Sequence, residues 1–212
     1  MNLDRQRIVD AALELLDKTG MEGLTMRKLA DALEVQAPAL YWYFPGKQAL
    51  FDEMAEALVA GIPGRITVSG DCREVMIDIA TELRLALLSR RDGARVFAGT
   101  FVARPNVLQV AEIALAALSR AGFGTRTAAR AIASLFYFVL GFVIEEQALV
   151  EQSRGTGGTH PMEEKFRAFS ASDYPHLTAA LPDLLETDQN ARFVFGVDLI
   201  LSGLLNGTAR NR

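Results

Sequence analysis

Apolar residues recur at helical spacing from the start of the chain. The pattern predicts an amphipathic helix from Asn2 to Thr19, and Gly20 stands where a helix C-terminus favours a residue that tolerates the left-handed conformation. The apolar positions follow the i, i+3, i+4, i+7, i+8 spacing of one helix face: Ile8, Ala11, Ala12, Leu15 and Leu16.

The next stretch, TMRKLADALEVQAPALYWYF from Thr25 to Phe44, predicts two short helices with a tight turn at Glu34–Val35. The Thr25 hydroxyl is placed to cap the first helix. Pro38 fits the first turn of the second, where its missing N–H leaves no bond unmade. The inward positions are Leu29, Ala30, Leu33, Leu40 and Phe44, and the outward ones are Ala37, Ala39, Tyr41, Trp42 and Tyr43. This layout is typical of a helix-turn-helix DNA reader.

Helical patterns continue through the rest of the chain, and no alternating strand pattern longer than a few residues interrupts them. We expect GIPGRITVSG, residues 61–70, to connect the N-terminal helices to a larger body, and residues 153–161 to form a flexible loop. The further predicted helices are Gly46–Leu58, Cys72–Arg90, Asn106–Ala121 (closed by Gly122), Ala128–Ile144 and Asn190–Leu205. The predicted fold is all-α, with a DNA-binding domain at residues 1–47 and a ligand-binding and dimerisation domain at 48–212.

The most apolar run, Ala128–Ile144, raises the alternative of a membrane span. It contains Arg130, leaves only about 14 uninterrupted residues and ends at Glu145–Glu146, which is short of the ~20 residues that a bilayer requires. We therefore expect no membrane association, and a helix that is buried on nearly every side. Together with the last helix it carries more apolar surface than one body of this size buries, which predicts a four-helix interface in a homodimer.

Composition narrows the class of protein. The single cysteine, Cys72, excludes an internal disulfide and a cysteine-rich metal site, and we expect a cytoplasmic protein. The net charge of −4 argues against indiscriminate coating of nucleic acid, and residues 1–50 carry six Lys or Arg against seven Asp or Glu. The placement of Arg27, Lys28 and Lys47 around the second short helix nevertheless favours DNA.

The N-terminal segments LTMRKLADALEV and LYWYFPGKQAL resemble the TetR family of bacterial repressors. Three later segments resemble the tetracycline repressors within that family: ALLSRRDGARVFAGT, AGFGTRTAARAI and GFVIEEQ. The resemblance covers most of the chain and weakens after about residue 150. It implies a DNA-binding end, a linking helix and a helical body that dimerises and senses a small molecule.

The resemblance also implies which residues contact an operator in double-stranded DNA. Arg27 resembles the arginine that reads guanine, for which bidentate contacts to O6 and N7 are the commonest specific pairing. Ala37, Ala39 and Tyr43 depart from the glutamine, threonine and histidine of the tetracycline repressors, so we expect a different operator. The full expected set is Thr25, Met26, Arg27, Ala37, Pro38, Ala39, Tyr41, Trp42, Tyr43 and Lys47.

The expected sensor departs further from the tetracycline repressors. Phe97 replaces the histidine that holds the drug-bound magnesium, Ile79 and Ala114 replace an asparagine and a glutamine, and Pro63 replaces a second histidine. We therefore expect no metal and no cofactor, and a small apolar or aromatic effector. The expected lining is Ile79, Leu83, Phe97, Thr100, Leu115, Ile132 and Glu145.

Two other classes of protein stay open at this point. An enzyme requires a nucleophile with a base or paired carboxylates in a cleft, but Cys72 has no nearby histidine. His160 and His176 lie in polar segments without a second ligand at metal spacing, so we expect both at the surface. A helical small-molecule-binding protein without DNA function would leave the exposed group of Arg27, Trp42 and Lys47 unexplained.

Overall fold

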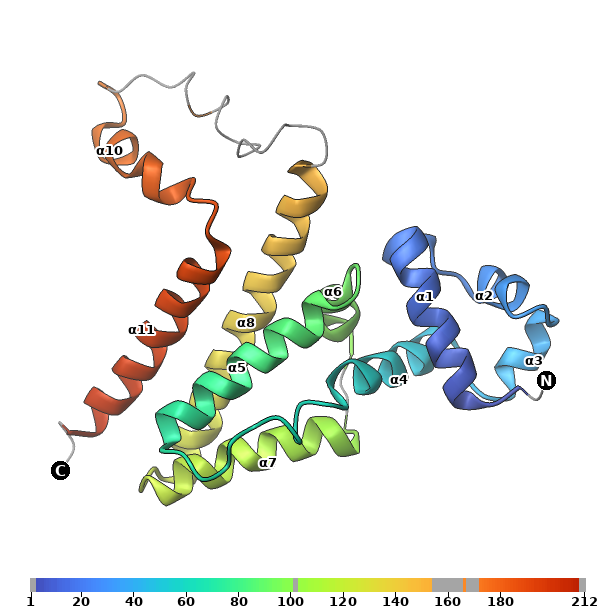
Figure 1. Cartoon of the computed structure of the whole chain (residues 1–212), viewed down its shortest axis with the longest axis horizontal. Coiled ribbons are helices and arrows are strands. Elements are labelled where there is room, and N and C mark those ends of the chain that lie inside the picture. The colour runs from blue at the N-terminus through green and yellow to red at the C-terminus, as the bar shows by residue number, and fades with distance from the viewer. Residues whose placement is uncertain (1–2, 101–102, 154–165, 167–171, 210–212) are drawn as a thin grey trace.

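The computed structural model describes residues 3–100, 103–153, 166 and 172–209, and every regular element in these ranges is a helix (Figure 1). This confirms the predicted all-α fold class. Helices α1 to α4 form one end of the molecule, and the remaining helices form the body (Figure 1). The helices are α1 Arg5–Gly23, α2 Met26–Ala32, α3 Ala37–Tyr41, α4 Lys47–Val59, α5 Cys72–Leu88, α6 Gly93–Ala98, α7 Pro105–Arg120, α8 Thr125–Ser153, α10 Pro175–Leu184 and α11 Gln189–Ala209.

Helix α1 differs in two ways from the expected Asn2–Thr19 helix. Gly20 has a φ of 69°, the left-handed conformation that ends a helix, but a further helical turn follows to Gly23. The buried face is also rotated, because Val9 and Leu13 are buried while Ala11 and Leu15 are only half-buried. The Asp4 side chain accepts a hydrogen bond from the backbone N–H of Arg7 and caps the helix.

Helix α4 joins the two ends of the molecule through its side chains. Leu50 and Met54 are fully buried in the N-terminal core, whereas Ala55 and Val59 are buried in the core of the body. The connector after α4 is also partly a core segment, because Ile62 and Ile66 are buried with the body. The two cores therefore meet along one helix.

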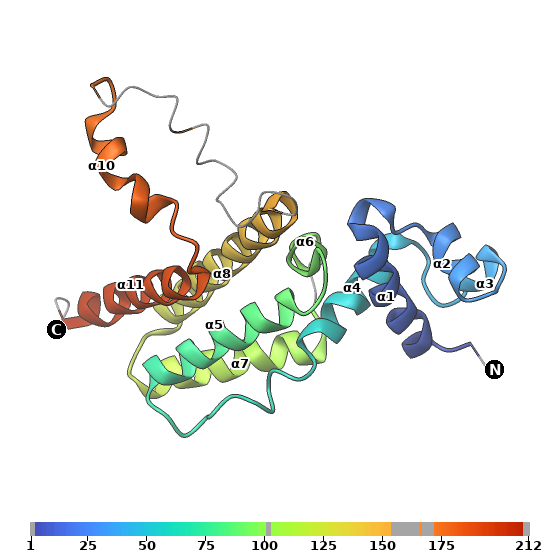
Figure 2. The ribbon, with the colours of Figure 1, turned by 45° about the horizontal axis from the view of Figure 1, so that its top comes forward.

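In the body, α5 packs against both α7 and α8, and α11 lies alongside α8 in both ribbon views (Figures 1 and 2). Helix α5 begins with a capping box, in which Asp71 accepts from the Glu74 N–H and the Glu74 carboxylate accepts from the Asp71 N–H. The core of the body includes the predicted α5 stripe of Val75, Met76, Ile79, Leu83 and Leu87.

The sequence pattern did not predict two of the described helices. Helix α6 is a short element between α5 and α7 that begins after Asp92, whose φ of 55° is left-handed. Helix α10 begins at Pro175 and has no buried residues. His176 is exposed on it. The expected loop at 153–161 and His160 lie, apart from Ser153, outside the described residues.

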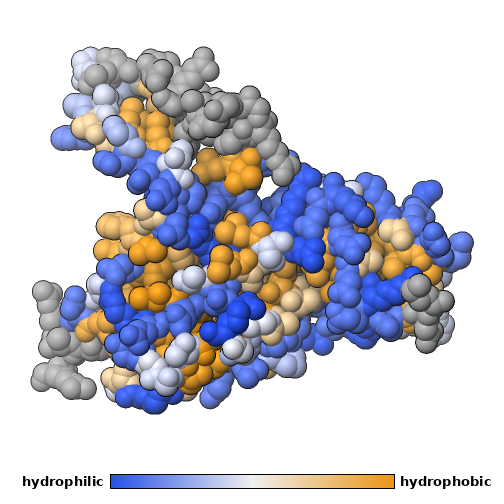
Figure 3. All heavy atoms as spheres, viewed as in Figure 1, coloured by the Kyte–Doolittle hydropathy of each residue, from blue (hydrophilic) through white to orange (hydrophobic). Residues whose placement is uncertain are grey.

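Helix α8 is longer and more exposed in the single chain than expected. It extends to Ser153, and only 22% of the most apolar part of its Thr125–Gln152 segment is buried, so burial on nearly every side is wrong for the chain by itself. By length and composition it is the one described helix that could cross a membrane. Hydrophobic side chains gather over α8 and α11 on the face shown in Figure 3.

Candidate DNA interface and effector cavity

Helices α2 and α3 form a compact pair at the end of the molecule farthest from α11 (Figure 1). The Thr25 hydroxyl accepts from the Lys28 N–H at 3.2 Å and caps α2. Glu34 adopts a φ of 57°, which makes the sharp turn between the helices. Leu40 and Phe44 are completely buried, and they hold α3 against the N-terminal core.

The surface of this pair carries most of the expected DNA contacts. Trp42 is 90% exposed and Tyr41 is 51% exposed. Thr25, Arg27 and Pro38 are also exposed, and Ala39 is half-buried.

The structure corrects two members of the expected contact set. Met26 is buried in the N-terminal core, because it occupies the inward side of the first turn of α2. Tyr43 does not face outward: its hydroxyl donates to the Leu3 carbonyl oxygen at 2.6 Å, and its ring packs against the N-terminal core. Ala37 is half-buried and packs partly against the same core.

Lys47 lies at the first position of α4, at the edge of this surface. Its ammonium group is 5.0 Å from the centre of the Phe51 ring, a cation–π distance. The side chain is half-buried and lies against Phe51 one turn further along α4.

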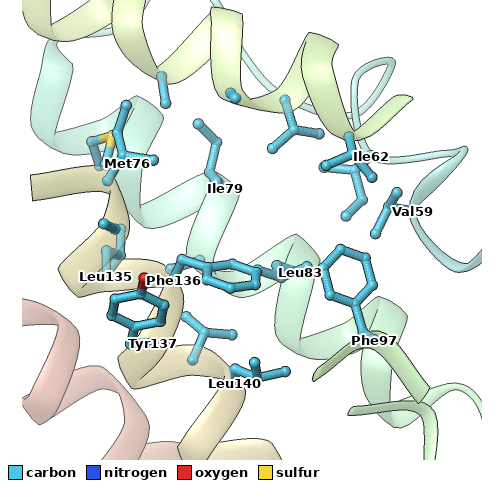
Figure 4. A pocket seen from close by; sticks show the side chains of 18 of the residues that line it. Val59, Ile62, Met76, Ile79, Leu83, Phe97, Leu135, Phe136, Tyr137 and Leu140 are labelled. Atoms are coloured by element: carbon cyan, nitrogen blue, oxygen red, sulfur yellow. The ribbon is translucent and has the colours of Figure 1, made fainter. Parts of the chain in front are cut away.

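The body encloses an apolar cavity of about 480 Å³, which is within the usual range for small-molecule sites. In Figure 4, Phe97 from α6 and Phe136 from α8 point toward each other, and their ring centres are 5.8 Å apart. The lining is Val59, Ile62, Met76, Ile79, Ala80, Leu83, Phe97, Ala98, Thr100, Val107, Val110, Ala111, Ala114, Ala129, Ile132, Ala133, Leu135, Phe136, Tyr137, Val139 and Leu140.

Among the described residues that line the cavity, only Thr100 and Tyr137 carry a side-chain hydroxyl, and none carries another side-chain oxygen or nitrogen atom. The Thr100 hydroxyl already donates to the Phe97 carbonyl oxygen at 2.7 Å. Tyr137 lies at the edge of the cavity (Figure 4), and its side chain is 69% exposed. The cavity therefore offers an effector aromatic and aliphatic surface and little hydrogen bonding.

Five of the seven expected lining residues surround this cavity: Ile79, Leu83, Phe97, Thr100 and Ile132. Leu115 does not line it and instead packs, half-buried, against the core of the body. Glu145 does not line it either, because it lies on the exposed side of α8. The structure thus places neither residue at this cavity, and their contact with an effector stays a prediction.

The neighbouring Glu146 is buried in an ion pair with Arg84 of α5. The contact is bidentate, with N–O distances of 2.9 and 2.7 Å. Arg84 also donates to Asn190 of α11 and lies 4.8 Å from the centre of the Phe193 ring. Three helices of the body are thus joined by one guanidinium.

Helix α6 connects the cavity to the DNA-binding end. Phe97 lines the cavity, while the adjacent Val96 is fully buried in the N-terminal core. The Asp92 carboxylate accepts from the Met21 N–H at 2.8 Å. Arg95 pairs with Glu22, and this hydrogen bond raises the pKa of the guanidinium, which therefore stays charged.

Cys72 does not have the character of a reactive thiol. Burial raises its pKa, and the negative charge of Asp71 raises it further. The neutral thiol is a poor nucleophile and a poor metal ligand.

One end of the molecule carries a helix-turn-helix surface, and a short helix joins it to an apolar cavity in a helical body. This arrangement defines a ligand-responsive DNA-binding regulator. Two family models match the chain. Bacterial regulatory proteins of the tetR family match residues 8–54, and the tetracyclin repressor-like C-terminal domain matches residues 67–207. The chain belongs to the TetR family of transcriptional regulators.

Individual relatives match over nearly the whole chain. The tetracycline repressor protein class A from transposon 1721 of Escherichia coli is 39% identical over 207 residues, which cover 95% of this chain and 90% of that protein. A possible TetR family regulator from Streptomyces coelicolor is 46% identical, with a TM-score of 0.85 and coverage of 96% and 99%. ActR of the same organism, solved with actinorhodin, is 25% identical, with a TM-score of 0.82 and coverage of 98% and 99%.

Proposed function

We propose that this protein is a homodimeric repressor that leaves a near-palindromic operator when a small, largely apolar or aromatic molecule enters the cavity of the body. The effector class rests on the described lining of the cavity, in which two hydroxyls are the only side-chain polar groups. Polar effector atoms buried against such a lining would lose water without gaining partners, at a cost of about 1–3 kcal/mol each.

The curated relatives are named for tetracycline, but this cavity does not fit a magnesium-bound polar drug. Magnesium prefers oxygen ligands, usually carboxylates with waters. The part of the lining that the structure describes contains no carboxylate and no imidazole. Phe97 stands where the resemblance places the magnesium-binding histidine. An effector that binds without a metal is the simpler match to these side chains.

Helix α6 supports a route from the cavity to the DNA. An effector that displaces Phe97 also displaces Val96 and Asp92, which contact the core and backbone of the DNA-binding end. The effector moves the equilibrium between DNA-binding and released forms only by its differential affinity for the two.

The proposed dimer forms through α8 and α11. The described part of α11 exposes Val194 (56%), Phe195 (71%) and Leu199 (63%), and α8 exposes Tyr137 and Val150. Exposed large apolar side chains gathered on two neighbouring helices are typical of an interface. Two copies joined here would present their α3 helices to successive major grooves about 34–36 Å apart.

Other classes of function are weaker matches. A small-molecule-binding protein without DNA function leaves the exposed Arg27, Tyr41 and Trp42 without a role. An enzyme is the least supported, because the lining residues that the structure describes include no acid, base or nucleophile pair. As a regulator of DNA the protein would act in the cytoplasm.

The test is a gel-shift assay with the DNA upstream of the gene for this protein. We expect a shifted band at nanomolar protein that resists excess nonspecific DNA, and its loss on addition of the effector found in a library of apolar aromatic molecules. Equal binding to all DNA sequences, or none, would contradict the proposal.

A further inference from the structure

Two carboxylates on α4 hold the start of α7. Glu56 accepts hydrogen bonds from the Asn106 backbone N–H at 2.9 Å and from the Asn106 side-chain amide at 2.7 Å. Arg104, the residue before α7, makes no side-chain cap, so Glu56 supplies an acceptor for an N–H group that has no partner within the helix. Glu53, one turn earlier on α4, pairs with the Arg104 guanidinium at 2.9 Å. Helix α4 therefore fixes where α7 begins.

The same oxygen atom of Glu53 also pairs with Arg5, the first residue of α1, at 2.7 Å. Arg5 in turn holds the segment that follows α3: it donates to the Tyr43 carbonyl oxygen at 2.6 Å and lies 4.5 Å from the centre of the Phe44 ring. Helix α4 lies between α1 and the body in both ribbon views (Figures 1 and 2). One carboxylate thus stands between the start of α7 and the end of α3.

The start of α7 also borders the effector cavity. Val107, in the first turn of α7, lines the cavity, and its neighbour Asn106 is the residue that Glu56 holds. A molecule that displaces Val107 therefore displaces Arg104, three residues earlier, and changes its contact with Glu53. This path runs through α7 and α4, and it uses none of the contacts of α6.

Glu53 has a specific electrostatic task, because it separates two like charges. Without its carboxylate, the guanidinium groups of Arg5 and Arg104 would lie close together without the counter-ion that they share, and they would repel each other. The side chains are 51% exposed for Arg5, 21% for Glu53 and 40% for Arg104, so water screens both pairs and their contribution to the free energy of unfolding is small. We therefore expect the network to affect position more than stability.

We propose that Glu53 couples the two ends of the molecule: by holding Arg5 and Arg104 on one oxygen atom, it makes the placement of α3 on DNA depend on the placement of α7. The inference rests on the proposed DNA-binding function. It adds a positioning residue that lies outside the expected contact sets for DNA and for the effector.

The experiment measures the affinity of the full-length protein for an operator selected from a random DNA library. Glu53→Gln keeps the shape of the side chain and removes its negative charge. Loss of a negative charge should by itself strengthen binding to DNA. Loss of the coupling should instead weaken operator binding, on the order of fivefold. The sign of the change therefore separates coupling from charge.

Glu82→Gln is the matched control. Glu82 pairs with Arg65 in the body, and its side chain has the same 21% exposure as that of Glu53. We expect this variant to bind the operator as tightly as the unmodified protein or slightly more tightly. Urea unfolding should give equal midpoints for the two variants, which would show that the loss of affinity in Glu53→Gln does not come from unfolding.

A double-mutant cycle with Arg104→Gln tests the coupling from the side of the body. Arg104→Gln alone should weaken operator binding, and in the Glu53→Gln background it should cause no further loss, because its partner is already gone. Arg104→Gln changes a partly exposed side chain, so it tests the same contact if Glu53→Gln lowers the urea midpoint.

Two results would overturn the inference while leaving the proposed function intact: losses that add in the double variant, or an operator affinity in Glu53→Gln that is unchanged or higher. A selection that yields no preferred sequence would instead contradict the proposed function, and this inference with it.

Discussion

Arg27 and Lys47 lie on the same end of the molecule but are placed for different tasks. Arg27 is exposed on the first turn of α2, with its guanidinium free to reach a base edge. Lys47 is half-buried, and its ammonium group lies over the Phe51 ring. A positive charge at the rim suits a phosphate, which carries no sequence information.

Substitution of Arg27 and of Lys47 should separate base recognition from phosphate binding. Arg27→Ala should cost about 1–3 kcal/mol and relax specificity at one base pair per half-site. Lys47→Ala should weaken all sequences alike and lower the slope of log K against log salt by about 1 per subunit. Anisotropy titrations on operator and single-base variants check this, and a uniform loss in both variants would refute the base contact of Arg27.

Phe97 is the residue that we expect to govern the effector response. Phe97→Leu removes the ring that faces Phe136 at 5.8 Å, so the effector concentration that releases DNA should change several-fold. Phe123→Leu is the matched control, because Phe123 is buried in the same core but does not line the cavity. Both should lose similar stability. An equal change of effector response in the two variants would show a general packing effect.

Some site residues were recognisable from sequence and others were not. The turn at Glu34, the buried Leu40 and the exposed Trp42 follow from local spacing alone. Tyr43 was misplaced because its hydroxyl bonds to a backbone carbonyl 40 residues earlier, a contact that no local pattern reveals.

At the scale of elements, the long helices other than α8 were predicted within about four residues of their bounds, because each has a capping residue or an apolar stripe. Helix α8 runs to Ser153, nine residues beyond the predicted end. Helix α6 has only six residues, too few to show a periodicity, and α10 buries no side chain that could create one. The division into domains at residue 47/48 stays a prediction. The core residues of α4 contribute to both ends of the molecule.

The Arg84–Glu146 pair joins α5, α8 and α11, and its partners are 62 residues apart in sequence. Glu146→Ala leaves a buried guanidinium without its counter-ion and should cost about 3–5 kcal/mol in the free energy of unfolding. Replacement of both partners, Arg84→Met with Glu146→Leu, should be much less damaging.

Urea unfolding at fixed protein concentration measures these differences, since dimerisation couples stability to concentration. Glu145→Ala is the control, because Glu145 is exposed, and it should stay within about 0.5 kcal/mol of the unmodified protein. A loss in Glu146→Ala as small as in this control would show that the pair contributes little.

At the scale of the whole molecule, the apolar faces of α8 and α11 need a partner. Phe195→Glu places a charge in the proposed interface and should shift the protein toward monomers at micromolar concentration. Leu108→Glu introduces the same charge at a residue that is 55% exposed on α7, and this variant should stay dimeric. Light scattering after size-exclusion chromatography distinguishes the two, and a monomeric unmodified protein would contradict the dimer.

The most direct test of the account is operator release measured with two kinds of effector on the same protein–DNA complex. We expect magnesium with tetracycline to leave the complex intact, because the described cavity lining gives its polar atoms few partners, while an apolar aromatic molecule releases the DNA. Release by magnesium–tetracycline at low micromolar concentration would contradict the proposed effector class, although not the fold.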